Sequence, residues 1–510
     1  MAEYIMMMGT SSDVGKSIIA AALCRILHQD GINTAPFKAQ NMALNSYVTK
    51  DGKEMGRAQV VQAEAAGIEP AVEMNPVLLK PTGNSCSQVI LMGKPVGNMS
   101  AREYHKGYSL KAFDTVTKAL KKLISEYDAL VIEGAGSPAE VNLKDNDIVN
   151  MRIAKYLKAP VLLVADIDRG GALAAIVGTL ELLEEDERDL VKGIIINKFR
   201  GDESLFTPAV DFLENKTGKP VLGIMPYLEN LGIEDEDSVA LDRKRTSPDD
   251  SEIQIAIIET PKISNFTDFD AFSDESDTGL YYVRDVESLG KPDLIILAGS
   301  KNTTEDMIYL RESGLESAIK GLHEEGTPII GICGGYQMLG RKILDPMHTE
   351  SDFDGTEGFG LLDMTTSFVE DKVTSQAKSD CVNLHFLGCD IHAEGIKGYE
   401  IHMGRTDFSP NIIHPFRLKE LSGNTHAESE GAASQDGLVF GTYLHGLFDH
   451  DIFRRSILNA IRRRKGLKSL PVTKNTYTEK QLAFDRLADT ARCHLNIKKI
   501  KDIMRMGAHL

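Results

Sequence analysis

Short apolar runs alternate with longer, helix-length segments through the first part of the chain. The runs cover residues 4–8, 32–37, 128–132, 160–165, 191–196 and 220–225. A short apolar run is typical of a buried strand, and its alternation with helical segments is typical of βαβ units. The pattern therefore predicts a mostly parallel sheet with helices on both faces.

The pattern breaks at residues 229–252, which are dense in charge and contain the turn-forming sequence Ser-Pro-Asp-Asp-Ser at 247–251. Such a segment is typical of a linker or a surface hairpin. The apolar run at 253–258 then starts a second α/β unit. Because 510 residues are too many for one core, we expect several units. They are an N-terminal domain at 1–232, a linker at 233–252, a second domain at 253–450 and a helical C-terminal extension at 451–510.

A cysteine stands where a predicted strand meets a predicted helix. The apolar run at 328–332 leads into Cys333, and glycines occupy the positions two residues before and two residues after it. Glycine allows a sharp turn that a side chain would obstruct, and a nucleophile at such a strand-to-helix turn is lifted above the sheet edge. We therefore interpret Cys333 as a catalytic nucleophile rather than as a buried structural cysteine.

A thiol nucleophile needs a general base, and His445 is the predicted one. The apolar run at 439–444 ends at this histidine, and a glycine follows it, so we expect the imidazole at the end of a strand. The chain contains 13 histidines, so the presence of a histidine alone is weak evidence for a catalytic base. His402, which follows a similar segment at 398–401, is the second choice.

The first apolar run is followed by the sequence Gly-Thr-Ser-Ser-Asp-Val-Gly-Lys-Ser at 9–17 and then by apolar residues at helical spacing. A strand, a glycine loop, Gly-Lys-Ser and a helix form the context of a phosphate-binding loop. We expect Thr10, Gly15, Lys16 and Ser17 to bind ATP, with Lys16 at the β- and γ-phosphates and Ser17 on Mg²⁺. Five residues separate the two glycines, where the strict motif has four.

Polar residues follow three more of the predicted strands. Glu133 follows the run at 128–132, Asp166 and Asp168 follow 160–165, and Asn197 follows 191–196. Ligands of open α/β sheets bind beyond the carboxyl ends of the strands. We therefore expect Glu133 to lie at the ligand-binding edge of the sheet.

Composition narrows the range of partners. The net charge of −18 argues against nucleic acid as a partner. The six cysteines lack Cys-x-x-Cys spacing, so neither a disulfide framework nor a zinc site is expected, and the predicted location is the cytoplasm. No segment approaches a membrane span, and no cleavable signal is recognised. We expect no tightly bound organic cofactor, and the sequence predicts no particular oligomeric state.

The segments at 331–340 and 443–448 resemble the class I glutamine amidotransferase domain of the cobyric and cobyrinic acid amidotransferase family. The resemblance implies that Cys333 attacks the side-chain amide of glutamine, with His445 as base. It also implies that backbone amides at Gly299 and Gly334 form the oxyanion hole. Many class I amidotransferases carry a glutamate two residues after the histidine, where this chain has Leu447. The cobyric acid branch also lacks that glutamate, so the sequence leaves open what orients His445.

The variant phosphate-binding loop resembles that of dethiobiotin synthetase and its relatives, which hold ATP beside an acceptor carboxylate. The resemblance implies a doubly wound P-loop domain of that type at the N-terminus. It further implies that Glu133 binds Mg²⁺ or the acceptor and that Asn197 recognises the nucleotide base. The amide-rich segment 37–46 resembles the cobyric acid synthase branch of the family.

A glutaminase and an ATP site on one chain imply an amide ligase. The acceptor carboxylate would be phosphorylated first, and ammonia would displace phosphate from the acyl phosphate. The branch resemblance implies amidation of the b, d, e and g side chains of adenosylcobyrinic acid a,c-diamide. Because the net negative charge repels such a corrinoid polycarboxylate, local cations would have to bind it. The predicted cations are Lys38, Arg57, Lys80, Arg169, Lys198 and Arg200.

Three alternatives remain at this stage. The first is cobyrinic acid a,c-diamide synthase, which shares both domains, although the segment 37–46 argues against it. The second is a glutamine-dependent synthetase of another pathway. The third is a P-loop ATPase switch without amidation, which would leave Cys333 and His445 without a role.

Overall fold

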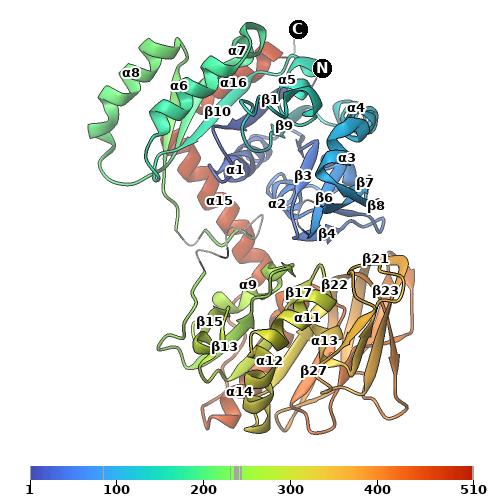
Figure 1. The fold of residues 1–510 in the computed structure, drawn as a ribbon. Helices are drawn as coiled ribbons and strands as arrows, with labels where there is room; N and C mark the ends of the chain where they lie inside the picture. Colours follow the sequence, from blue (N-terminus) through green and yellow to red (C-terminus); the bar gives the residue numbers. More distant parts are fainter. Residues whose placement is uncertain (1, 84–85, 230, 235–240, 242–243, 508–510) are drawn as a thin grey trace.

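The computed structural model describes residues 2–83, 86–229, 231–234, 241 and 244–507. Two α/β parts lie end to end (Figure 1), and the predicted linker lies between them in the sequence. Residues 235–240 and 242–243 of that linker, 233–252, lie outside the described residues. Helix α15 (Thr476–His494) runs back from the second part to the first.

A parallel sheet of six strands forms the centre of the N-terminal part, in the order β12–β11–β10–β1–β9–β2. Its strands are β1 Glu3–Gly9, β2 Thr34–Phe37, β9 Ala129–Glu133, β10 Val161–Asp166, β11 Val191–Phe199 and β12 Val221–Pro226. Neighbouring residues of β1 enter two separate apolar cores, with Met6 in one and Met7 in the other. Both faces are therefore covered, as the apolar runs predicted.

Helices of this part include α1, whose first residues belong to the glycine-rich loop region. The bounds are α1 Lys16–Gln29, α2 Arg57–Ala65, α3 Ala101–Glu103, α4 Ser109–Glu126, α5 Met151–Leu157, α6 Ala172–Leu182, α7 Glu185–Leu190 and α8 Thr207–Thr217. With the parallel sheet they give the doubly wound α/β domain that the sequence predicted.

A smaller sheet, which the apolar pattern did not predict, lies on the side that faces the second part (Figure 1). It has the order β3–β6–β7–β8 and a neighbouring β4–β5 hairpin. The strands are β3 Gln40–Met42, β4 Ser46–Val48, β5 Glu54–Gly56, β6 Val77–Gly83, β7 Cys86–Leu91 and β8 Lys94–Ser100. The amide-rich segment 37–46 therefore runs from the end of β2 through β3 to the start of β4.

The second part has its own sheet, in the order β15–β13–β16–β18–β27–β26, in which only β26 is antiparallel to its neighbour. Its strands are β13 Ile253–Ile258, β15 Thr278–Val283, β16 Leu294–Leu297, β18 Ile329–Ile332, β26 Ala432–Ala433 and β27 Val439–Thr442. Its helices are α9 Asp270–Ser273, α10 Val286–Leu289, α11 Thr303–Glu312, α12 Leu315–Glu324 and α13 Gly334–Leu339. The predicted second α/β unit is present.

A long antiparallel pair, β21 (Met364–Phe386) and β22 (Cys389–Phe408), belongs to a separate mixed sheet of the second part. The other strands of that sheet are β19 (Lys342–Leu344), β20 (Gly355–Glu357), β23 (Phe416–Leu421), β24 (Asn424–Thr425) and β25 (Ser429–Glu430). Short β14 (Ile263–Ser264) and β17 (Gly299–Ser300) form a separate bridge.

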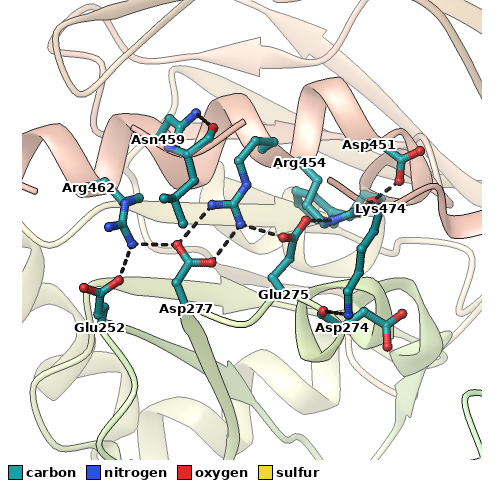
Figure 2. Close-up of polar contacts among 12 residues, drawn as sticks. Glu252, Asp274, Glu275, Asp277, Asp451, Arg454, Asn459, Arg462 and Lys474 are labelled. Atoms are coloured by element: carbon teal, nitrogen blue, oxygen red, sulfur yellow. Dashed lines mark hydrogen bonds and ion pairs between the residues drawn. The ribbon is translucent and has the colours of Figure 1, made fainter. Parts of the chain in front are cut away.

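The C-terminal helices connect the two parts. Three arginines of α14 (Asp451–Arg464) reach carboxylates beside β13 and β15 (Figure 2). Arg455 and Arg462 both lie 2.8 Å from Asp277, and Arg454 lies 2.8 Å from Glu275. These ion pairs hold α14 on the second part.

The rest of the extension packs on the first part. Arg25 of α1 pairs with Asp485 of α15 at 2.8 Å, and α16 (Ile497–Gly507) packs against β1. The extension therefore ties the P-loop helix to the second part. No helix in the described part of the chain has the length and apolarity needed to cross a bilayer.

Candidate active site

Cys333 occupies a strained turn between β18 and α13, with φ 53° and ψ −109°. Positive φ is unfavourable for a residue with a side chain and persists where the surrounding packing enforces it. A Cβ atom on Gly335 would lie 2.0 Å from the Leu297 carbonyl oxygen, and one on Gly331 would lie 2.7 Å from the Gly335 oxygen. The turn therefore requires both glycines, and it has the sharp geometry that the sequence predicted.

His445 follows β27 and is held by a carboxylate that the sequence did not reveal. Its Nδ1 lies 2.7 Å from Asp268 Oδ2, and Asp268 Oδ1 accepts a hydrogen bond from Gly446 N at 3.1 Å. Both side chains are buried. Burial favours the neutral imidazole, but the charges of Asp268 and Cys333 outweigh it and raise the pKa of His445 to about 10. The site can therefore hold a charged imidazolium beside Cys333.

His402, the second choice for the base, has different surroundings. Its ring stacks on Tyr443 at 3.7 Å, and Nδ1 lies 2.9 Å from the Gly404 carbonyl oxygen. Burial lowers the pKa of His402 to about 4, so the ring is neutral near pH 7. Since the polar partner of its Nδ1 is a carbonyl and not a carboxylate, the geometry favours His445 as the base.

Cys333 and His445 open onto one small cavity of about 30 Å³. Its lining comes from both parts of the protein and consists of Lys80, Ser264, Asn265, Ser300, Lys301, Thr303, Cys333, Gln337, Glu350, Phe368, Lys372, Ile401, His402, Met403 and His445. Lys80 belongs to β6 of the N-terminal part. The cavity therefore lies where the two parts meet.

The predicted oxyanion residues lie next to this cavity. A Cβ on Gly334 would lie 2.7 Å from Ser300 N, so the two backbones are in close approach. Gly299 is paired with Ser264 in the β14–β17 bridge, and Ser300 rather than Gly299 is on the cavity lining. Ser300, the neighbour of Gly299 in the predicted loop, therefore faces the cavity, and the role of this loop in the oxyanion hole stays a prediction.

The glycine-rich loop forms a compact cradle at the end of β1. Gly15 has φ +92° at the start of α1, a conformation that glycine adopts without strain. Lys16 Nζ donates to the carbonyl oxygens of Ser11 and Gly136, at 3.1 and 3.3 Å. Thr10 N donates to Val164 O at 3.0 Å, which fixes the loop to β10. The lysine therefore folds over the loop into which phosphates would enter.

Glu133 lies beside this loop, as expected from its place at a strand end. One carboxylate oxygen accepts from Ser17 Oγ and from Lys38 Nζ, both at 2.9 Å, and the other accepts from Gln62 Nε2 at 2.6 Å. Ser17 and Glu133 thus supply adjacent hydroxyl and carboxylate oxygens, and oxygen atoms are the ligands that Mg²⁺ prefers. Within the described residues there is no cluster of three or more His, Cys, Asp or Glu that could hold a metal.

Asn197, which the family resemblance assigns to recognition of the nucleotide base, lies against the glycine-rich loop. Its Nδ2 donates to Val14 O at 2.8 Å, and a Cβ on Gly15 would lie 2.1 Å from the same nitrogen. Asn197 and Asp166 are register partners on β11 and β10, so both stand at the carboxyl edge of the sheet. Both Asn197 and Gly15 line a larger cavity of about 880 Å³ that extends toward the second part.

The six predicted substrate-binding cations all have carboxylate partners. They pair as Lys38 with Glu133, Arg57 with Glu234, Lys80 with Glu54, Arg169 with Asp13, Lys198 with Asp166 and Arg200 with Asp168. Their charge is therefore partly neutralised within the protein.

The N-terminal part touches the surroundings of the catalytic histidine. Ser46 N donates to Asn265 Oδ1 at 2.9 Å, and Tyr399 Oη donates to Ser46 O at 3.0 Å. The Tyr399 ring stacks on His445 with centroids 5.0 Å apart, and Asn265 Nδ2 lies 3.3 Å from His445 Nδ1. The end of the amide-rich segment is therefore in contact with two of the residues that surround the imidazole, Asn265 and Tyr399.

A buried carboxylate joins the two parts beside the same cavity. Glu54 of β5 lies 2.9 Å from Lys80 and 2.6 Å from Lys372 of β21. All three side chains are 6% exposed or less. This ion cluster closes the interface next to Cys333.

The sequence analysis did not predict Asp268, because the residue belongs to no recognisable motif. It lies 177 residues before His445, in a short helical turn (Phe266–Phe269) after β14. The preceding strand, β14, has only two residues, so no apolar run leads to Asp268.

Comparison with known proteins adds independent information. Residues 254–453 match the model of the CobB/CobQ-like glutamine amidotransferase domain, and residues 5–239 match the CobQ/CobB/MinD/ParA nucleotide binding domain. The two matches cover the two α/β parts and agree with a glutaminase centre and a nucleotide loop on one chain. The amidotransferase match argues against a simple ATPase switch.

Similar proteins align along nearly the whole chain. The cobyric acid synthase of Pelotomaculum thermopropionicum is 54% identical over 507 residues, covering 98% of this chain and 96% of its own length. That of Moorella thermoacetica is 52% identical, covering 99% and 98%. That of Salmonella arizonae is 51% identical, covering 99% of each. The chain therefore belongs to the family of the cobyric acid synthases, glutamine-dependent amide ligases.

Proposed function

We propose that this chain uses ATP and glutamine to amidate the b, d, e and g carboxylates of adenosylcobyrinic acid a,c-diamide. The observation that carries the proposal is the shared cavity, in which Cys333 and His445 face Lys80 of the nucleotide-binding part. Ammonia made at one site is needed at the other, and this arrangement brings the glutaminase site against the domain that would use it. The choice of acceptor follows the name that the relatives carry, cobyric acid synthase.

The glutaminase half-reaction uses the second domain. His445 takes the thiol proton of Cys333, and Sγ attacks the side-chain carbonyl carbon of glutamine. Backbone amides of Ser300 and Gly334 stabilise the oxyanion. The carbon–nitrogen bond then breaks, the leaving ammonia takes the proton from His445, and a glutamyl thioester remains for hydrolysis. Asp268 fixes the tautomer of the imidazole and stabilises its charged form.

The ligase half-reaction uses the first domain. The acceptor carboxylate takes the γ-phosphoryl group of ATP, since carboxylate oxygen is a poor leaving group without activation. Gly15 and the other loop amides bind the phosphates with Thr10, and Lys16 neutralises charge during transfer. Ser17 and Glu133 would hold Mg²⁺, which supplies further neutralisation. Ammonia then attacks the acyl phosphate and releases phosphate.

We propose that ammonia passes between the two centres along the amide-rich segment 37–46. At one end, Lys80 Nζ donates to Ser46 Oγ at 3.0 Å, and at the other end Lys38 pairs with Glu133. Between them Asn45 is 1% exposed, and neither of its amide atoms has a hydrogen-bond partner among the described residues. Ammonia both donates and accepts hydrogen bonds, so unpaired buried amides suit its passage.

Paired substitutions test the proposal. Cys333→Ala should abolish amidation with glutamine but keep amidation with a high concentration of ammonium, because the ligase site is separate. Lys16→Ala should stop amidation with either nitrogen source while Cys333 remains reactive toward a thiol reagent. Amide product, glutamate release and thiol labelling are measured for both variants.

The results test the glutaminase site and the ligase site separately. Glutamate release by Cys333→Ala would refute the nucleophile, and full ATP-dependent amidation by Lys16→Ala would refute the ligase site. Loss of thiol reactivity in Lys16→Ala would contradict two centres joined only by ammonia.

A further inference from the structure

An oppositely charged pair lines the catalytic cavity and has no role in the chemistry described so far. Lys301 Nζ lies 3.7 Å from Glu350 Oε1, and the two side chains are 7% and 8% exposed. Among the described residues, Glu350 Oε2 accepts one hydrogen bond, a long one of 3.4 Å from Thr303 N. The pair is thus buried beside Cys333 without close contacts between its charges.

Such a pair is poorly satisfied on its own. A separation of 3.7 Å is too long for a direct hydrogen bond, and buried charges are costly unless they are closely paired. Burial raises the pKa of Glu350, with Lys301 opposing the shift. The other two lysines of the cavity, Lys80 and Lys372, instead approach Glu54 to 2.9 and 2.6 Å. Lys301 and Glu350 therefore have the greater capacity to accept another charged group.

We propose that Glu350 binds the α-ammonium group and Lys301 the α-carboxylate group of the glutamine substrate. An α-amino acid carries both charges on one carbon atom, so it matches two opposite charges that lie side by side. With glutamine bound, each buried side chain gains a charged partner. The inference rests on the proposed glutaminase function of Cys333, and it assigns the recognition of the substrate rather than its cleavage.

The backbone around the pair keeps it at a fixed distance from the reacting atoms. Lys301 directly follows Ser300, whose amide faces Gly334 at the proposed oxyanion site. Thr303 Oγ1 donates to Gln337 Oε1 of α13 at 3.0 Å, which fixes this loop to the helix after Cys333. The same short loop would therefore hold the side-chain carbonyl and the carboxylate of glutamine.

Glu350 is positioned from the other side. Its backbone N donates to Asp345 Oδ2 at 2.9 Å, and Asp345 is fully buried. A site of this kind selects free glutamine, because the α-nitrogen of glutamine within a peptide is an uncharged amide that cannot pair with Glu350. It also rejects analogues that lack one of the two charges.

Truncated substrates test each charge separately. Ammonia release is measured for wild type, Glu350→Gln and Lys301→Met with L-glutamine, with 4-carbamoylbutanoate, which lacks the α-ammonium, and with 4-aminobutanamide, which lacks the α-carboxylate. Glu350→Gln should raise the KM for glutamine about 10- to 100-fold, the range expected for a hydrogen bond to a charged group, with kcat little changed. Its KM for 4-carbamoylbutanoate should equal that of wild type. Lys301→Met should likewise raise the KM for glutamine, and its KM for 4-aminobutanamide should equal that of wild type.

A matched control uses Glu357→Gln, which removes an exposed carboxylate of β20 whose partner is Lys342 at 3.3 Å. This variant should keep the wild-type KM for all three substrates, and ammonium-dependent amidation by each variant should show that it folds. An equal rise in the KM for glutamine and for the truncated substrate, or a lower kcat at constant KM, would overturn the assignment. If wild type itself released no ammonia from glutamine, the glutaminase proposal would fail instead.

Discussion

The most informative single substitution is Asp268→Asn, because it tests the residue that the sequence did not reveal. Asparagine keeps the size of the side chain and removes its charge. In the wild type, Asp268 accepts from His445 Nδ1 at 2.7 Å and from Gly446 N at 3.1 Å. With asparagine, the imidazole loses the anion that stabilises its protonated form, and its tautomer is no longer fixed.

The size of the effect follows from these contacts. A hydrogen bond between charged groups contributes about 1.5–3 kcal/mol, which corresponds to about 10- to 150-fold in rate. Loss of the correct tautomer adds to this, and the same Asp-to-Asn change in a serine-protease triad lowers kcat about 10⁴-fold. Because Asp268 also helps to raise the pKa of His445 to about 10, we expect glutaminase kcat to fall about 10²- to 10⁴-fold.

The assay is glutamate release, with ammonium-dependent amidation as the internal control for folding and for the ligase site. Asp285→Asn is a matched control, since Asp285 caps α10 through Ser288 N at 2.8 Å and asparagine can cap in the same way. The control should keep its glutaminase activity. A kcat within about threefold of wild type in Asp268→Asn would refute the role of Asp268, because even one lost charged hydrogen bond costs more than that.

Two further predictions use the surroundings of the site. His445→Ala should lower glutaminase kcat about 10²- to 10⁴-fold, while His402→Ala should cause a much smaller loss; the reverse order would move the role of base to His402. Burial, followed by the charge of Glu400, raises the pKa of Glu430 from 4.5 to about 8. Its stabilising contribution is therefore present below its unfolded-state pKa and is lost as pH rises through about 8. Urea denaturation should show wild-type stability falling between about pH 5 and pH 9, and a smaller fall in Glu430→Gln; equal slopes would contradict the shift.

The sequence predicted the local features of this site and missed the distant ones. The turn at Cys333 is encoded within five residues, because its glycines are required by contacts of 2.0 and 2.7 Å. The phosphate loop is likewise a local motif on a strand and a helix. Asp268 meets His445 only through the fold, so no spacing along the chain could identify it.

The strands, too, were predicted only where a local apolar run marks them. Strands buried on both faces, such as β1 and β10, are continuous apolar runs and were predicted. The long strands β21 and β22 alternate buried and exposed positions, and many of their residues are polar, so the runs that mark a buried strand are absent. Likewise, the contact between Lys301 and Glu350 joins two loops that are far apart in the sequence.

The central claim is that ammonia passes within the protein from the glutaminase site to the ligase site. An isotope competition tests it most directly. The wild-type protein is given ATP, adenosylcobyrinic acid a,c-diamide, glutamine labelled with ¹⁵N in its side-chain amide and an equal concentration of unlabelled ammonium. The product is then analysed by mass spectrometry. The account predicts a product whose new amides are nearly all ¹⁵N, because the proposed route along the segment between Lys80 and Glu133 keeps the ammonia from mixing with solvent. Label in proportion to the two nitrogen sources, or no amidated product, would contradict it.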